Sequence, residues 1–186
     1  MVRSVNMPSS ISSGMLKYLW IAFVVVFIDQ ITKWMAEANL ELGGESYKVF
    51  PHLDFTLGYN YGAAFSFLAG QGGWQRWFFV ILAAVVSIAI IIWLARLAKS
   101  DKGMAVGLTL ILGGAIGNGI DRLLHGKVTD FIDVYADWDV FFLSKWNDGF
   151  SHFATFNVAD IAINIGAIIL VSISLFTKDE ESKETK

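Results

Sequence analysis

The chain has 186 residues, of which 55% are hydrophobic and 17% are charged, whereas about 25% of residues are charged in an average soluble domain. Its mean hydropathy is +0.54, and a soluble domain of this length would struggle to hide so much apolar surface. The absence of cysteine excludes a disulfide scaffold, a thiol nucleophile and a thiolate metal site. The net charge of −3 excludes a basic nucleic-acid-binding protein.

Four apolar stretches are long enough to cross a bilayer, which takes about 17–25 helical residues. The first contains Asp29 and Lys33, and it qualifies only if both are tolerated inside the span. The sequence therefore predicts an all-α polytopic membrane protein with four transmembrane helices, in which residues 1–186 form a single membrane domain. The spans are predicted at about 16–36, 76–96, 103–123 and 158–177.

Lys and Arg predict the orientation of these spans, because they are concentrated in cytoplasmic segments. They gather in the N-terminal segment, the link between the second and third spans, and the tail at 178–186. The loops at 37–75 and 124–157 carry more acids than bases. We therefore expect both termini in the cytoplasm, both long loops outside, and a disordered charged tail. The basic residues on the cytoplasmic side are Arg3, Lys17, Arg96, Lys99, Lys102, Lys178, Lys183 and Lys186.

The two outer loops are rich in aromatic residues. Residues 47–59 alternate in part between apolar and polar side chains, which is typical of short strands. Residues 131–156 contain many more aromatic side chains, and these suit the membrane interface. We therefore expect a small extracytoplasmic β-rich platform beside the four helices.

Polar residues at membrane depth are candidate functional positions, because they are costly to bury there. Asp29 and Lys33 are four residues apart and share one helix face. For these residues we favour a support role over direct chemistry, either as a structural ion pair or with Lys33 reaching towards lipid headgroups. Asp121 and Arg122 are adjacent near the outer end of the third span, and we expect a structural ion pair there as well.

The glycine-rich segment at 113–122 has no preceding strand, which argues against a phosphate-binding loop. Gly113 and Gly117 are spaced as a small-xxx-small surface, which is typical of close helix packing in membranes. The segment is therefore interpreted as a packing face.

Asp130 follows the third span and Asp160 opens the fourth. Taken singly, Asp130 is best interpreted as a loop acid and Asp160 as a helix-start residue. The two spans are adjacent and antiparallel, however, so their outer ends meet and the two carboxyls can approach each other. Two close carboxyls share one proton, which is the chemistry of aspartic proteolysis. No HExxH or GxSxG pattern occurs, so a zinc or serine mechanism is poorly supported.

Five motifs follow one another along the chain: DQITK at Asp29, NYGAAF at Asn60, GGAIGNGIDR at Gly113, VTDFID at Val128 and FNVAD at Phe156. In this order they resemble the lipoprotein signal peptidase family (signal peptidase II), a family of bacterial aspartic membrane proteases. The resemblance covers roughly residues 15–177. The stretch from Val134 to Thr155 is longer than this family leads us to expect.

The resemblance implies that Asp130 and Asp160 are catalytic, with no metal and no cofactor. The substrates would be prolipoproteins that carry a diacylglyceryl group on a cysteine, cleaved just before that cysteine. It also implies that the protein lies in the bacterial inner membrane, with its active site towards the outer face. The protein would contact membrane lipid and no nucleic acid, and a monomer would suffice for activity. The residues expected to bind substrate or support the site are Asp29, Lys33, Asn60, Gly62, Asn118, Asp121, Arg122 and Asn157.

Two other classes remain open at this stage. A small proton-coupled membrane transporter also places acids beside Lys and Arg within its spans, although four spans without a repeat offer little scaffold for alternating access. In a purely structural membrane protein, every one of these polar residues would serve packing.

Overall fold

The computed structural model describes residues 14–62, 73–136 and 151–184, with side chains described for 14–62, 73–135 and 155–176. Its helical elements are the 3₁₀ turn η1 (Leu16–Tyr18) and the helices α1 (Leu19–Asn39), α2 (Trp74–Arg96), α3 (Lys102–His125) and α4 (Val158–Glu184). Its strands are β1 (Tyr47–Phe50), β2 (Leu53–Asn60), β3 (Val128–Ala136) and β4 (Ser151–Phe156).

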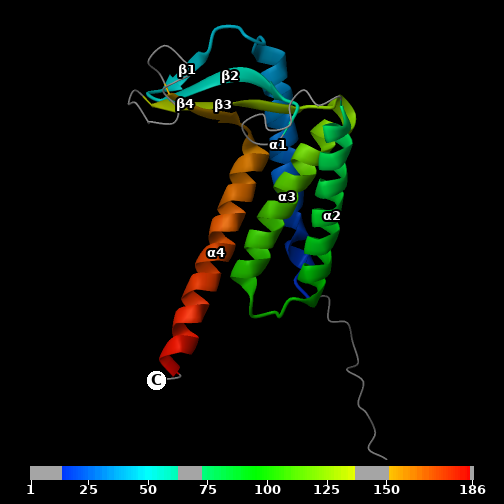
Figure 1. Ribbon diagram of the computed structural model, residues 1–186, viewed down its shortest axis with the longest axis vertical. Coiled ribbons are helices and arrows are strands. Elements are labelled where there is room, and N and C mark those ends of the chain that lie inside the picture. The colour runs from blue at the N-terminus through cyan, green and yellow to red at the C-terminus, as the bar shows by residue number, and fades with distance from the viewer. Residues whose placement is uncertain (1–13, 63–72, 137–150, 185–186) are drawn as a thin grey trace, which may run out of the picture.

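Within the described ranges, four helices are long and apolar enough to cross a membrane, as the sequence predicts. They lie side by side, and the sheet lies across one end of them (Figure 1). The helices extend a few residues beyond the predicted spans. The expectation of a disordered tail is wrong for residues 178–184, because α4 continues through Glu184.

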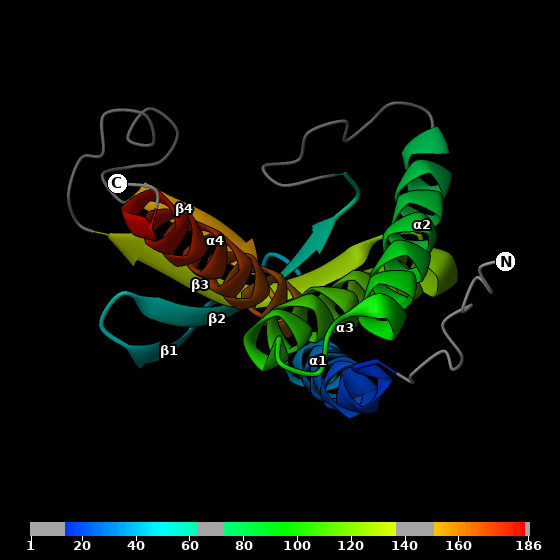
Figure 2. The same ribbon diagram turned by 90° about the horizontal axis from the view of Figure 1, so that it is seen from below.

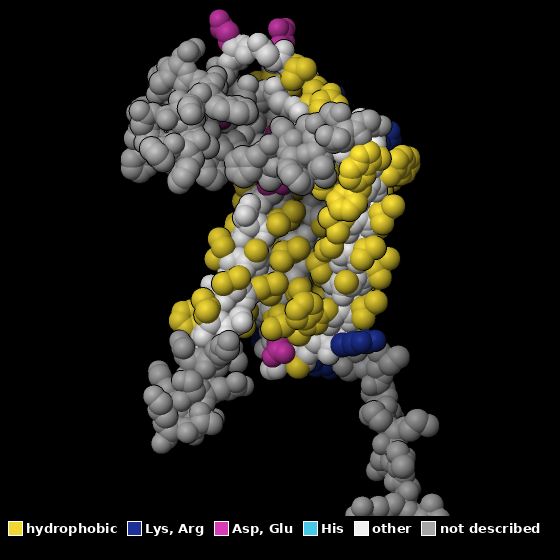
Figure 3. Space-filling view, in the orientation of Figure 1, with side chains coloured by type: hydrophobic (Ala, Val, Ile, Leu, Met, Phe, Trp, Pro, Cys, Tyr) yellow, Lys and Arg dark blue, Asp and Glu magenta, His cyan; other side chains and the backbone are white. Residues whose placement is uncertain are grey.

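The helix surfaces are those of a membrane protein. Large apolar side chains are exposed along α1 and α2, and yellow hydrophobic atoms cover the visible sides of the helices in Figure 3. Water would penalise such a surface, whereas hydrocarbon does not. Examples are Trp20, Phe23, Phe27, Trp77, Ile81 and Ile88.

Helix α3 is central and packs on each of the other three, as the view along the bundle shows (Figure 2). The half of the bundle away from the sheet holds an apolar core in which Leu94 of α2 meets Leu108 and Leu112 of α3. Met15 closes this core, and its amide donates to the carbonyl of Leu94 at 2.8 Å. The half near the sheet contains the polar residues instead.

Small residues bring α3 against its neighbours. A Cβ on Gly113 would lie 2.7 Å from Cβ of Val25 on α1, and a Cβ on Gly117 would lie 2.6 Å from a carboxyl oxygen of Asp29. A Cβ on Gly114 would collide with the backbone oxygen of Ala159 on α4. The packing face predicted from Gly113 and Gly117 is confirmed, and it gives the polar residues of three helices close contact.

The four strands form one antiparallel sheet in the order β1-β2-β3-β4. The strands expected within residues 47–59 are confirmed as β1 and β2, and so is the β-rich platform. Strand β3 follows α3 directly, and its Asp130 is paired with Gly58 of β2. The sheet therefore carries Asp130 to the ends of α3 and α4 that adjoin it. Most of the unusually long stretch after Val134 lies outside the described residues.

The close approach of α3 and α4 predicts that Gly114→Ala destabilises the protein. The added methyl group meets backbone that cannot rotate away, so overpacking should cost about 1–3 kcal/mol. The matched control is Gly103→Ala on the same helix, where the added Cβ meets only the flexible end of Ile173 at 3.1 Å. Thermal unfolding in detergent should show a lower midpoint for Gly114→Ala alone. Equal midpoints for the two variants would contradict the packing described above.

Candidate active site

The first turn of α4 is held by a reciprocal pair of hydrogen bonds. The amide of Asp160 donates to Oδ1 of Asn157 at 3.0 Å, and the amide of Asn157 donates to Oδ2 of Asp160 at 3.3 Å. This is a capping box, with Asp160 at the third helical position. Free amides at the start of a helix need partners, and in a bilayer water cannot supply them. The motif that begins α4 therefore also fixes the carboxyl of Asp160.

Asp29 of α1 satisfies another free amide of this turn. Its Oδ1 accepts the amide of Ala159 at 2.8 Å, and its Oδ2 pairs with Lys33 at 2.8 Å. Asp29 is fully buried, and Lys33 is 4% exposed. The ion pair predicted from the spacing of these two residues is confirmed, and it joins α1 to the start of α4.

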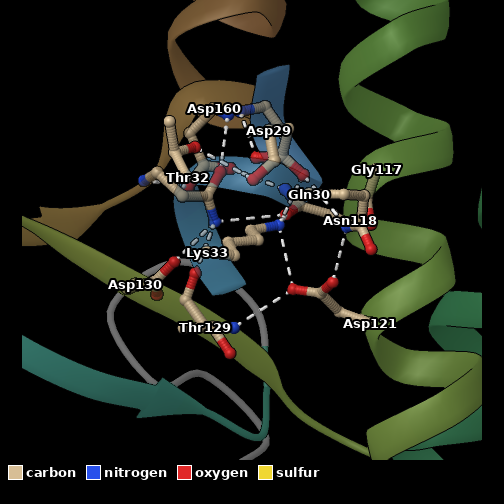
Figure 4. A network of polar contacts seen from close by, with 12 residues as sticks. Asp29, Gln30, Thr32, Lys33, Gly117, Asn118, Asp121, Thr129, Asp130 and Asp160 are labelled. Atoms are coloured by element: carbon tan, nitrogen blue, oxygen red, sulfur yellow. Dashed lines mark hydrogen bonds and ion pairs between the residues drawn. The ribbon is translucent and has the colours of Figure 1, made fainter. Parts of the chain in front are cut away.

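The ammonium group of Lys33 also reaches α3. It pairs with Oδ2 of Asp121 at 2.9 Å and donates to Oδ1 of Asn118 at 3.0 Å. The expected pairing of Asp121 with Arg122 is wrong, because adjacent residues on a helix point to different faces. Asp121 faces α1 and Lys33 instead, as Figure 4 shows.

Arg122 lies on the side of α3 that faces the end of β2. Its guanidinium donates to the carbonyl of Gly62 at 2.8 Å and to the carbonyl of Asn118 at 3.3 Å. It also lies over the ring of Phe79 of α2, 4.8 Å from the ring centre. Gly62 in turn donates its amide to the side chain of Asn60 at 3.0 Å, which closes the bend after β2. Arg122 therefore holds this bend against α3.

Asn157 contacts both candidate catalytic acids. Its Nδ2 donates to Oδ1 of Asp130 at 2.6 Å, while its backbone amide donates to Asp160. Asp130 is 5% exposed, and the side chain of Asn60 also donates to its carboxyl. Burial, together with the negative charge of Asp160, raises the pKa of Asp130 to about 7 from 3.8, against the opposing effects of Asn157, Lys33 and Asn60. Asp130 is thus suited to hold a proton at neutral pH.

The structure brings all ten residues singled out from the sequence into one connected network, part of which Figure 4 shows. Sequence reasoning missed Gln30 and Thr129. Gln30 donates to Asp121 at 2.8 Å, and the amide of Thr129 donates to Asp121 at 3.2 Å. Both sit beside residues that were chosen, but no spacing rule separates them from their neighbours. Across the described residues, no group of three or more His, Asp or Glu side chains could hold a metal ion.

Comparison with known proteins identifies the family. The family model of signal peptidase II matches residues 21–176. A lipoprotein signal peptidase of Hydrogenovibrio crunogenus is 46% identical over 176 residues, 95% of each chain. This chain belongs to the signal peptidase II family. A lipoprotein signal peptidase of Coxiella burnetii is 48% identical over 160 residues, which cover 86% of this chain and 90% of that one.

The fold agrees with this membership. A bacterial membrane enzyme solved by the in meso method is 34% identical, with a TM-score of 0.72 over 91% of this chain and 93% of that one. The resemblance based on the five motifs is therefore confirmed. Because the members of this family are aspartic peptidases, the chain is an aspartic endopeptidase. The transporter and the purely structural protein are thereby set aside.

The raised pKa of Asp130 predicts a pH-dependent stability difference between wild type and Asp130→Asn. A carboxyl whose folded pKa lies above its unfolded value stabilises the fold most at low pH, and that contribution is lost as pH rises through about 7. Asparagine does not titrate. The free energy of unfolding of Asp130→Asn, measured relative to wild type, should therefore rise between pH 5 and about pH 7 by up to about 1.4 kcal/mol per pH unit, and the thermal midpoint should follow it. Parallel midpoints across this range would contradict the raised pKa.

Proposed function

We propose that Asp130 and Asp160 are the catalytic pair of this signal peptidase, and that it cleaves prolipoproteins just before their diacylglyceryl-modified cysteine. The observation that carries the proposal is the bridge made by Asn157, which hydrogen-bonds to both carboxyls. It supports two acids acting on one substrate bond, as aspartic proteolysis requires.

The surroundings of the two acids support different roles. Asp160 accepts Nδ2 of Asn118 at 2.8 Å and the amide of Asn157 at 3.3 Å, and these two donors hold its carboxyl in one orientation. Asp130 is buried, and its raised pKa favours the protonated form. Asp160 is therefore proposed as the base that activates water, and Asp130 as the acid.

The reaction then needs no covalent intermediate. Asp160 takes a proton from water as the water oxygen attacks the scissile carbonyl carbon, and Asp130 gives its proton to the carbonyl oxygen. The resulting diol breaks its C–N bond while the nitrogen takes the proton from Asp160. A hydroxyl proton of the diol returns to Asp130, so that both acids regain their starting states. Because the two carboxyls act as one unit, apparent pKa values from kinetics belong to the pair.

The position of the site suits a substrate that remains in the membrane. Asp160 lies in the first turn of a membrane-capable helix, and Asp130 lies on the adjoining sheet. In such a substrate the signal peptide ends at the outer membrane interface, and the lipid-modified cysteine follows it there. We place the enzyme in the bacterial inner membrane with its site towards the outer face, in contact with membrane lipid and with prolipoprotein substrates. A single chain contains both acids, so a monomer suffices.

The distribution of charge supports this orientation. Lys17, Arg96, Lys99 and Lys102 lie at the end of the bundle opposite the sheet, where dark blue side chains gather in Figure 3. The start of α1 and the end of α4 lie at the same end (Figure 1). Basic residues are retained in the cytoplasm during insertion, so both termini are proposed to be cytoplasmic.

Asp130→Asn and Asp160→Asn should each reduce turnover at least about 1,000-fold while the protein still folds, because an amide keeps the shape but cannot transfer the proton. The double variant should be hardly worse than either single variant, since the two acids act as a unit. Processing of a lipid-modified prolipoprotein by purified enzyme in detergent measures this.

The matched control is Asp101→Asn, which removes an exposed carboxyl at the far end of α3. It should leave turnover unchanged. Normal processing by either Asp130→Asn or Asp160→Asn would refute the proposed pair. A double variant far slower than both single variants would show that the two acids act separately.

The proposed orientation predicts a labelling pattern. The chain has no natural cysteine, so a single introduced cysteine reports its own position. Ser46→Cys lies before β1 and Ser100→Cys lies between α2 and α3, and both residues are exposed. A membrane-impermeant maleimide added to spheroplasts should label Ser46→Cys and reach Ser100→Cys only after lysis. The reverse pattern would invert the topology.

A further inference from the structure

Lys33 has more contacts than an ion pair requires. An ammonium group has three hydrogens to donate and no acceptor. In this structure its contacts are Asp29 on α1, Asp121 on α3 and Oδ1 of Asn118 on α3. The contacts with Asp29 and Asp121 neutralise charge. The third contact is with the neutral amide of Asn118, which itself donates to Asp160, a proposed catalytic acid.

The contact with Lys33 decides which way the amide of Asn118 faces. Because an ammonium group can only donate, the oxygen of Asn118 has to face Lys33. The nitrogen then points to the opposite side, where it donates to Oδ1 of Asp160 at 2.8 Å. With the amide turned over, two donors would meet at Lys33, and the amide oxygen would meet the carboxylate of Asp160. Each of those contacts is repulsive.

We propose that Lys33 is a positioning residue that fixes the amide of Asn118, so that Asn118 donates to Asp160 and holds it as the base. This inference rests on the catalytic pair proposed above and adds a role for a buried charge that lies where α1 meets α3. Lys33 touches neither acid in the described contacts, and its effect on Asp160 passes through Asn118.

The second amide of the site is fixed in a similar way. Oδ1 of Asn157 accepts the backbone amide of Asp160, so its Nδ2 faces Asp130. That same Nδ2 lies 3.2 Å from Oδ1 of Asn118, which gives the oxygen of Asn118 a second donor. This Nδ2 also donates to Asp130 and to the carbonyl of Thr129, so its hydrogen bond to Asn118 is only one of three. The hydrogen bond from Lys33, by contrast, comes from a charged ammonium group. Charge-assisted hydrogen bonds are about twice as strong as neutral ones, so Lys33 dominates.

A simpler role for Lys33 is to neutralise buried acids. The charged groups that face this region are Asp29 on α1, Asp121 and Arg122 on α3, Asp130 on β3 and Asp160 on α4. Replacing Lys33 alone would leave Asp29 and Asp121 without their cation, which is destabilising in a buried site. A test therefore has to separate charge balance from amide positioning.

The double variant Lys33→Met/Asp121→Asn makes that separation. It removes one positive and one negative charge, so the net charge of the cluster is unchanged, while Asn118 loses its ammonium partner. We expect this variant to unfold at a higher temperature than Lys33→Met. Its kcat should still fall about 100-fold, with KM within about threefold of wild type. The exposed lysine change Lys48→Met is the matched control and should leave kcat and KM unchanged.

Combining this variant with Asn118→Ala shows whether the effect passes through Asn118. If Lys33 acts by orienting that amide, the charge-balanced change should cost about 100-fold in the wild-type background and no more than about threefold in the Asn118→Ala background. The proposal would be overturned if the charge-balanced change lowered kcat by the same factor in both backgrounds. It would also be overturned if the charge-balanced variant had the wild-type kcat.

The same assay distinguishes this inference from the function on which it rests. If wild type does not process the prolipoprotein, or Asp130→Asn and Asp160→Asn still do, the proposed function is wrong. If wild type is active and both acid variants are inactive while the Lys33 and Asn118 effects multiply, only the positioning role is wrong.

Discussion

Asp29 determines how three of the helices meet. One carboxyl oxygen accepts the amide of Ala159 in the first turn of α4, and the other pairs with Lys33 on its own helix. Gly117 leaves room for that carboxyl on α3, where a Cβ would lie 2.6 Å away. A fully buried charge at membrane depth is tolerated only when it is paired and hydrogen-bonded. The positions of α1, α3 and α4 are therefore linked through one side chain.

The bundle separates two tasks along its length. Away from the sheet, large apolar residues such as Leu94 and Leu108 fill the space between helices. Near the sheet, glycines of α3 allow the helices to approach more closely, and polar side chains of neighbouring helices hydrogen-bond to one another. Apolar packing holds the helices together without fixing polar geometry. The hydrogen-bonded half needs that support, because a partly satisfied polar network in a low-dielectric setting is costly.

The proposed site is built from ordinary features of secondary structure. Asp160 is an acid in the first turn of a helix, and Asn157 is that helix's cap. Each would be expected there in a protein without any catalytic role. What differs is the neighbour: strand β3 places Asp130 against the same cap. The cap then holds two carboxyls together, and burial with a charged neighbour raises the pKa of one of them.

The sequence by itself determined the four helices, the strands within residues 47–59 and ten members of the polar network, because long apolar runs, alternation and polar residues inside spans each reflect a local physical cost. It predicted the pair of Asp29 and Lys33, which lie four residues apart on one helix, but not the ion pairs and hydrogen bonds between separate helices and strands. Their adjacency in the sequence suggested that Arg122 pairs with Asp121. On helix α3, however, the two side chains point to different faces, and Asp121 pairs with Lys33 of α1. Nor did it reveal Gln30 or Thr129 as members of the network. Pairing depends on which faces of separate helices meet, and only the tertiary structure decides that.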